Sequence, residues 1–282
     1  MSRTIDGPVF ATELGDAGPR ICFLHGLFGQ GKNWTTIAKA LADRARLLLV
    51  DLPDHGRSAW TETFSYSGMA AGVGDLLGRE GSGEPYVVVG HSMGGKVAMM
   101  LALQHPELVD RLCVVDVSPV EYPGLRDFGR FVEGMRTLDL DRLPDRATAD
   151  RELEPYVESA TIRSFLLQNL RRNLDGGARG GDTHGSAPQW QWQMNLQLLG
   201  DHLTELGGWP LASDADRRIG PYEGPVIWVA GENSDYVRPE FASTMRSLFP
   251  RTQLVTIKGA SHWVHADRPE VFLATLRRFA GL

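Results

Sequence analysis

The stretch that decides the fold is "VVVGHSMGG", residues 87–95. Its valines favour a buried strand, and "MGGKVAMMLALQHP" (93–106) favours a helix that stops at a proline. At their junction, residues 90–94 match the pattern G-x-S-x-G in the strand–turn–helix setting that gives this pattern meaning. Small neighbours permit a strained turn that holds the serine hydroxyl clear of the sheet. Ser92 is therefore the candidate nucleophile, and a helix-capping serine in a glycine-rich turn is the alternative.

Short apolar runs recur along the chain and alternate with helical patterns. Continuous apolarity suits strands that are buried on both faces of a parallel sheet. The predicted strands are 20–26, 45–51, 85–91, 111–117, 224–230 and 252–258. The predicted helices between and after them are 33–43, 93–106, 238–249 and 267–280. The sequence therefore predicts an α/β fold with a mostly parallel central sheet flanked by helices, and ligands near the carboxyl ends of the strands.

Residues 118–220 break this alternation, because no apolar strand run occurs there. The interval shows helical patterns instead, such as 125–138 and 160–174, and "QWQWQMNLQLLGDHLTEL" (189–206) stands near its end. Its Gly/Arg-rich piece, 171–188, is predicted to be a mobile loop. Because strands resume afterwards, we expect 118–220 to be a helical cap inserted into a core made of 1–117 and 221–282. An independent second domain is the alternative.

Composition limits the classes of partner. The chain has 282 residues, of which 42% are hydrophobic and 23% charged, as in ordinary globular proteins. A net charge of −6 and the lack of a dense basic block argue against nucleic acid or an anionic membrane surface as partner. Cys22 and Cys113 lie in strand-like runs and are expected to be buried thiols. No signal-like region or run long enough for a membrane span is found, so a cytoplasmic location is expected.

Two backbone N–H groups are candidates for stabilising an oxyanion beside Ser92. Met93 stands at the start of the predicted helix, where N–H groups face outward. Leu27 lies in "FLHGLFG" (23–29), the loop after the first core strand. His25 in the same loop is expected to fix the loop by a hydrogen bond rather than to act in the reaction.

The candidate base follows the last predicted strand. "IKGASHWVHADRPE" (257–270) supplies His262 and His265. In the strand–turn–helix architecture the nucleophile, acid and histidine occur in that order along the chain, and His262 is nearer the strand end. We therefore expect His262 to be the base and His265 to belong to the loop or helix start. No constellation of carboxylates or cysteines suited to a metal accompanies the two histidines, so neither a metal nor another cofactor is predicted.

Several motifs together resemble the α/β-hydrolase superfamily, and more narrowly its YbfF-like branch of esterases and thioesterases with their mitochondrial abhydrolase-domain relatives. The motifs are "HGLFG" (25–29), "DLPDHGRS" (51–58), "GHSMGGKVAM" (90–99), "VVDVSPVEYP" (114–123), "GASHWVHADRPE" (259–270), "FLLQNL" (165–170) and "WQMNL" (192–196). The resemblance runs from about residue 20 to the C-terminus. It implies a serine hydrolase that cleaves short- to medium-chain esters or thioesters through an acyl-enzyme. An acyltransferase and a non-catalytic receptor for a small ligand are the alternatives on this fold.

The same resemblance bears on the acid of the triad. Most members carry this acid in a pattern G-x-x-D-x-x-V. When the pattern is aligned with "GENSDYV" (231–237), Ser234 stands at the aspartate position and Asp235 follows one residue later. The YbfF-like branch takes its acid from the strand after the nucleophile's helix. Asp116 stands at that strand's end, 24 residues after Ser92 (116 − 92). Asp116 is therefore the predicted acid and Asp235 the alternative.

The remaining expectations concern the surroundings of the site. Asp51, Asp54 and His55 lie in a motif that resembles the turn after another core strand, so a structural role is expected for them. The substrate pocket is expected between the cap and the rim of the sheet. Its candidate lining residues, besides Met93, are Phe28, Phe131, Phe165, Trp190 and Trp192.

Overall fold

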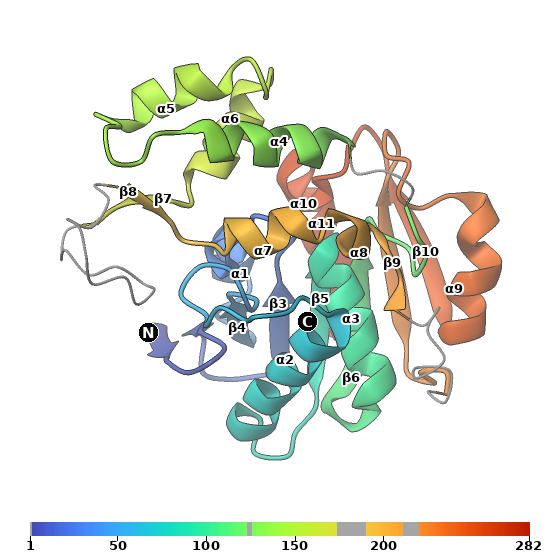
Figure 1. Ribbon diagram of the computed structural model, residues 1–282. Helices are drawn as coiled ribbons and strands as arrows, with labels where there is room; N and C mark the ends of the chain where they lie inside the picture. The colour runs from blue at the N-terminus through green and yellow to red at the C-terminus, as the bar shows by residue number, and fades with distance from the viewer. Residues whose placement is uncertain (1, 123–125, 174–189, 211–219) are drawn as a thin grey trace.

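The computed structural model describes residues 2–122, 126–173, 190–210 and 220–282, which form an eight-stranded sheet with helices on both faces (Figure 1). The strand order is β1-β2-β4-β3-β5-β6-β9-β10. The pairs β1/β2 and β2/β4 are antiparallel, and all other neighbours are parallel. The strands are β1 (Ser2–Ile5), β2 (Ala11–Leu14), β3 (Arg20–Leu24), β4 (Arg46–Val50), β5 (Tyr86–His91), β6 (Val109–Val115), β9 (Val226–Gly231) and β10 (Thr252–Ile257). The predicted mostly parallel sheet is confirmed.

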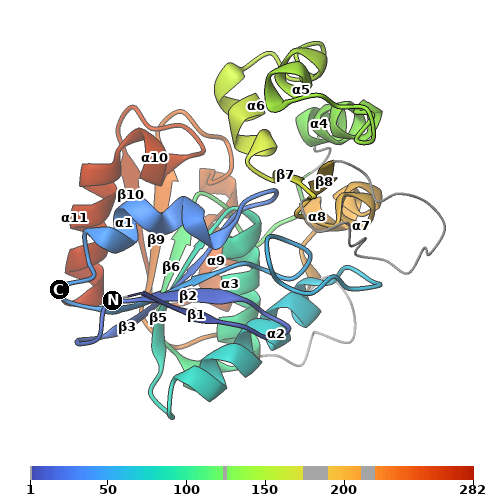
Figure 2. The ribbon, with the colours of Figure 1, turned by 90° about the vertical axis from the view of Figure 1, so that its left-hand side faces the viewer.

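Helices cover the two faces of the sheet (Figure 2). One apolar cluster joins the sheet to α2 (Tyr66–Glu80), α3 (Met93–Gln104) and α9 (Ala242–Leu248). A second cluster joins the opposite face to α1 (Thr35–Lys39) and α11 (Pro269–Ala280). Burial on both faces explains why the strands read as continuous apolar runs. Shorter elements complete the core: η1 (Gly31–Trp34), η2 (Pro106–Leu108), η4 (Pro239–Phe241) and α10 (Val264–Asp267).

The two cysteines face opposite sides of this sheet. Cys22 belongs to the cluster under α2 and α3, whereas Cys113 belongs to the cluster under α1 and α11. Both are free, fully buried thiols, and burial raises the pKa of each above its usual range. The expectation of buried thiols is confirmed.

The interval between β6 and β9 supplies the elements above the sheet (Figure 1). They are α4 (Arg126–Thr137), α5 (Arg146–Leu153), α6 (Ala160–Leu167), β7 (Leu170–Arg172), β8 (Trp190–Trp192), α7 (Leu196–Asp201) and α8 (Leu203–Gly207). Of the described residues in this interval, none joins the eight-stranded sheet. The boundaries 117/118 and 220/221 of the cap stay a prediction. The predicted loop 171–188 lies largely outside the described residues.

The cap is not helical throughout, which corrects the sequence prediction. Residues 170–172 and 190–192 form the antiparallel pair β7/β8 instead of extending the helical patterns around them. The reason is visible in β8, where Trp190 and Trp192 are buried and Gln191 between them is half-buried. That alternation has the period of a strand rather than of a helix.

Four further elements were not predicted from the sequence: β1, β2, α2 and α5. Strand β1 is exposed and strand β2 is half-buried over most of its length, so neither has a continuous apolar run.

Two asparagines attach the cap to loops at the carboxyl ends of core strands. The side-chain amide of Asn169, just after α6, donates to the backbone oxygen of Phe28 at 2.7 Å, and its oxygen accepts from Gln30 Nε2 at 2.5 Å. Asn195, before α7, donates its backbone N–H to the Asp54 oxygen at 2.8 Å and its side-chain amide to Asp54 Oδ1 at 3.0 Å. The motifs "FLLQNL" and "WQMNL" therefore carry polar contacts that help to dock the cap.

Candidate active site

Ser92 lies in a sharp turn between β5 and α3. Its φ of 54° and ψ of −121° are rare for a residue with a side chain. A Cβ on Gly90 would come within 2.2 Å of the Gly94 oxygen, and one on Gly94 within 2.4 Å of the His25 oxygen. The flanking glycines are therefore required by close backbone approach. The Ser92 N–H donates to the Val115 oxygen at 3.0 Å, which ties the turn to β6.

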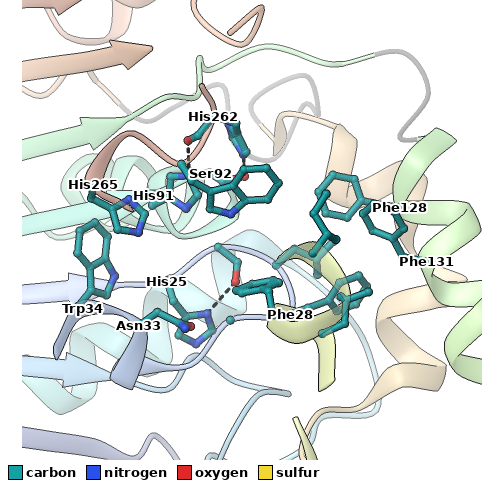
Figure 3. Close-up of a pocket in the computed structure, with 17 residues that line it drawn as sticks. His25, Phe28, Asn33, Trp34, His91, Ser92, Phe128, Phe131, His262 and His265 are labelled. Carbon is teal, nitrogen blue, oxygen red and sulfur yellow. Dashed lines mark hydrogen bonds between the residues drawn. The ribbon is translucent and has the colours of Figure 1, made fainter. Parts of the chain in front are cut away.

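His262 reaches Ser92 from the loop between β10 and α10 (Figure 3). Its Nε2 lies 3.0 Å from Ser92 Oγ, and its Nδ1 lies 2.8 Å from Asp116 Oδ2. The ring of Tyr236 stacks on the imidazole with centroids 4.3 Å apart. His91 Nε2–H donates to the backbone oxygen of His262 at 2.9 Å, which fixes the loop. The imidazole is thus oriented to accept the serine proton while Nδ1–H donates to the carboxylate.

Asp116 is the carboxylate beside this imidazole. It follows β6 with φ 52° and is fully buried. Its Oδ1 accepts from the Gly231 N–H at 2.9 Å, and its Oδ2 accepts from the Ser234 hydroxyl as well as from His262. Asp235 is exposed, and its backbone oxygen accepts from Arg238 Nε. The structure therefore brings Asp116, and not Asp235, to His262. Ser234 stands at the position that the superfamily pattern gives to the aspartate, and its hydroxyl donates to Asp116.

The two expected oxyanion donors flank Ser92. The N–H groups of Gly95 and Lys96 both donate to the Ser92 oxygen, and the N–H of Met93 stands ahead of them in the first turn, where a helix offers no partner. Leu27 lies in the loop after β3 and lines a hollow together with Ser92 and Met93. Met93 thus follows the serine directly along the backbone and Leu27 borders the same hollow, so both stay the predicted oxyanion donors.

Two buried histidines brace the loop that carries Leu27. His25 Nδ1–H donates to the Gly26 oxygen at 2.8 Å, and its Nε2 accepts from the Leu52 N–H at 2.9 Å. His55 Nδ1–H donates to the Pro53 oxygen at 2.9 Å, and its Nε2 accepts from the Phe28 N–H at 3.2 Å. Burial lowers the pKa of His25 to about 4 and that of His55 to about 3, so both rings are neutral.

The acidic residues of the same motif hold backbone rather than reach Ser92. Asp51 accepts from the N–H groups of Gly31 and Arg57, at 2.7 and 2.9 Å. Asp54 accepts from Thr61 as well as from the cap. These contacts are of the structural kind that the motif predicts.

An apolar hollow with an empty volume of about 540 Å³ opens at Ser92 and His262 (Figure 3). Of the expected lining residues, Phe28, Phe131 and Phe165 border it. Residues that sequence reasoning missed also border it: Phe128, Ile162, Leu166 and Trp263. Spacing gives the signal for Phe128, Ile162 and Leu166: Phe128 lies three residues before Phe131 on α4, and on α6 Ile162 lies three residues before Phe165 and four before Leu166.

The placement of Trp190 and Trp192 in this pocket was wrong. Both line a different hollow, with Trp60 and Leu140. Pairing of β8 with β7 holds them inside the cap, and Trp190 Nε1 donates to the Leu143 oxygen at 2.8 Å.

The described residues contain no group of three or more His, Cys, Asp or Glu side chains placed to hold a metal ion. Within the same residues, no helix has the length and apolarity that crossing a bilayer requires.

A family model described as the alpha/beta hydrolase fold matches residues 19–269. The chain belongs to this family. A mouse (Mus musculus) relative, the sn-1-specific diacylglycerol lipase ABHD11, is 40% identical over 272 residues, which cover 94% of this chain and 82% of that protein. Esterase YbfF of Escherichia coli is 27% identical over 259 residues, 92% of each chain. Among solved structures, a marine microorganism esterase has a TM-score of 0.86 and 29% identity, covering 96% of this chain and 98% of that one. These members of the α/β-hydrolase family support ester hydrolysis as the class of reaction.

Proposed function

We propose that this protein cleaves short- to medium-chain carboxylic esters through an acyl-enzyme on Ser92. One observation carries the proposal: a continuous hydrogen-bonded path runs from Ser92 Oγ through His262 to Asp116, with separations of 3.0 and 2.8 Å. A nucleophile, a base and a group that orients the base are the parts that acyl transfer to serine requires.

In the first half of the reaction, His262 Nε2 takes the Ser92 proton while Oγ attacks the ester carbonyl. The carbonyl oxygen becomes an oxyanion that accepts from the N–H groups of Leu27 and Met93. Asp116 stabilises the imidazolium through Nδ1–H and does not take up the proton. His262 then protonates the leaving oxygen, and the alcohol departs.

In the second half, His262 removes a proton from water, which attacks the acyl-enzyme carbonyl. The same two N–H groups hold the second oxyanion, and His262 returns the proton to Ser92 Oγ as the acid is released. The cycle needs no metal or other cofactor.

The apolar hollow supports an ester with a hydrocarbon part, because aromatic and aliphatic side chains make up most of its lining. The ABHD11 and YbfF relatives are a lipase and an esterase by name, which favours oxygen esters. A thioester presents the same carbonyl to Ser92, and its thiolate leaves more readily than the alkoxide of an ester. Acyl-CoA thioesters therefore belong in the same substrate test.

The test compares wild type with Ser92→Ala on 4-nitrophenyl esters and acyl-CoA thioesters of increasing chain length. Removing the nucleophile should lower kcat by at least about 10⁴-fold, and intact mass should show an acyl adduct on wild type alone. Ser247→Ala, which alters an exposed serine on α9, is the matched control and should keep full activity. Equal turnover by Ser92→Ala would overturn the proposal, and predominant ethyl-ester product in added ethanol would assign acyl transfer instead.

A further inference from the structure

A second hollow, with an empty volume of about 350 Å³, also opens at Ser92. It shares Leu27, Ser92 and Phe128 with the apolar hollow but has a different far end. The rest of its lining includes one cation and three phenols: Lys96, Tyr66, Tyr122 and Tyr236. The two hollows thus differ in that only the second has a cationic side chain, Lys96, in its lining.

Lys96 is the unusual member of this lining. It lies one helical turn after Ser92 on α3 and is 2% exposed. Its Nζ donates to the oxygens of Gly207 and Gly208, at 2.8 and 2.5 Å, and lies 4.9 Å from the ring centroid of Tyr122. An ammonium has three donors, so one remains after the two carbonyls are counted.

Nothing in the described part of the chain neutralises this cation by contact. No carboxylate there lies within 4.0 Å of Lys96 Nζ, although arginine side chains such as Arg3 and Arg136 do form such pairs. Burial lowers the pKa of Lys96 to about 7, with a smaller opposing effect of Glu121. Burying a charge without a counter-ion lowers the stability of the folded state. A methionine or leucine at this position would avoid that cost and bury apolar surface instead.

The chemistry of leaving-group departure decides which part of the ester enters which hollow. His262 must protonate the leaving oxygen, and His262 lines the apolar hollow. Met93, the oxyanion donor on α3, lines the Lys96 hollow. The alcohol part therefore enters the apolar hollow, and the acyl chain takes the other hollow that opens at Ser92, the one lined by Lys96.

We propose that Lys96 binds a carboxylate at the far end of the acyl chain, so that half-esters of dicarboxylic acids are preferred substrates. This inference rests on the proposed ester hydrolysis at Ser92. The carboxylate accepts the remaining ammonium N–H and supplies the counter-charge that the hollow lacks. The alternative, that Lys96 only fastens α3 to the end of α8 through Gly207 and Gly208, predicts no substrate preference.

The experiment measures kcat/KM for monoethyl esters of C4–C10 dicarboxylic acids and for ethyl esters of fatty acids of the same length, by chromatography of the released acid. Wild type should prefer the half-ester at one chain length by about tenfold or more, as expected for a charged hydrogen bond. Lys96→Met should lower this half-ester to fatty-ester ratio by about tenfold or more. Lys39→Met, which removes an exposed cation on α1, should keep the wild-type ratio.

The ratio separates recognition from stability, because a general loss of folded protein lowers both rates alike. If Lys96→Met does not fold, inhibition of wild type gives a second readout: a free dicarboxylic acid should compete with a fatty ester more strongly than the fatty acid of equal length. Two outcomes overturn the Lys96 site alone. In the first, wild type cleaves esters in a Ser92-dependent manner but shows no half-ester preference at any chain length. In the second, Lys96→Met is less stable but keeps the wild-type ratio. Failure of wild type to cleave either ester series overturns the proposed function itself.

Discussion

The rim of the sheet, which is the set of strand carboxyl ends and following turns that carries Ser92 and Asp116, meets the cap at Ser92. The rim and the cap hold their residues by different means. Ser92 and Asp116 stand directly after β5 and β6, on backbone with positive φ that the neighbouring strands fix. The cap is docked by the side chains of Asn169 and Asn195, by the backbone N–H of Asn195, and by aromatic contacts such as Phe28 with Phe128, whose ring centroids lie 6.2 Å apart. The reacting groups thus depend on the sheet, whereas the shape of the pocket depends on side chains that can change without altering the sheet.

Backbone strain follows the same division. Apart from Ser82, the described non-glycine residues with positive φ are Phe28, Asp54, Ser92 and Asp116, all at the carboxyl ends of core strands. Such conformations cost about 1–3 kcal/mol each and persist only where the surroundings fix them. Here the parallel ladders of the sheet supply that constraint, so strain is concentrated where reacting groups must be held.

The largest effect should come from the rim. Asp116→Asn keeps the size of the side chain but removes the negative charge that orients His262 and stabilises its imidazolium. We expect kcat for an activated ester to fall about 10⁴-fold with little change in fold, as measured by steady-state kinetics and circular dichroism.

Asp235→Asn is the matched control, because Asp235 is exposed and lies on the loop after β9, next to Ser234, whose hydroxyl donates to Asp116. It should stay within about twofold of wild type, since surface substitutions away from a site have small effects. A full-speed Asp116→Asn enzyme together with a slow Asp235→Asn enzyme would reverse the assignment of the acid.

Sequence alone predicted most of the rim. Alternation of apolar runs and helices gave the parallel sheet, and G-x-S-x-G between strand and helix placed Ser92 at its rim. Asp116 was preferred on spacing and resemblance, and the structure places it at His262. These features are predictable because they follow from local backbone geometry and from the order of strands.

The contacts of the cap were harder to predict. Trp190 and Trp192 carry the composition of a pocket but are held in a short strand pair whose partners are far apart in sequence. The contacts of Asn169 with Phe28 and of Lys96 with Gly207 each join residues more than one hundred positions apart. No local pattern encodes such pairs, because they depend on how the cap settles on the core.

An intermediate effect should come from the junction of the two regions. Asn169 is fully buried and holds the backbone oxygen of Phe28, next to the proposed oxyanion donor Leu27. Asn169→Leu leaves that oxygen and Gln30 Nε2 without this partner, which costs about 1–3 kcal/mol. We expect kcat to fall by roughly 10- to 100-fold, with a smaller change in KM.

Asn195→Leu tests whether this effect belongs to the oxyanion loop or to cap docking in general. Asn195 contacts Asp54 rather than the loop of Leu27. Its removal should lower the melting temperature while reducing kcat less than Asn169→Leu does. Equal losses of kcat in the two variants would show that the cap acts on the site as a whole.

The smallest effect should be a pH dependence of stability that belongs to the rim loops. Burial holds the pKa of His25 at about 4 and of His55 at about 3, below the ordinary 6.5 of the unfolded chain. Between these values the unfolded state binds more protons, so stability is full above pH 6.5 and falls as the pH decreases toward 4. In that range, each of these histidines lowers the free energy of unfolding by roughly 1.4 kcal/mol for every pH unit of acidification.

His55→Gln removes one of these groups while keeping a polar side chain. Denaturant unfolding from pH 7 to 4.5 should give a free energy of unfolding that decreases less steeply with acidity than in wild type. Between pH 7 and 8 the two curves should run parallel, because neither state binds protons at this site there. Identical acid slopes would mean that the rim does not hold His55 neutral, because a protonated Nε2 can no longer accept from the Phe28 N–H.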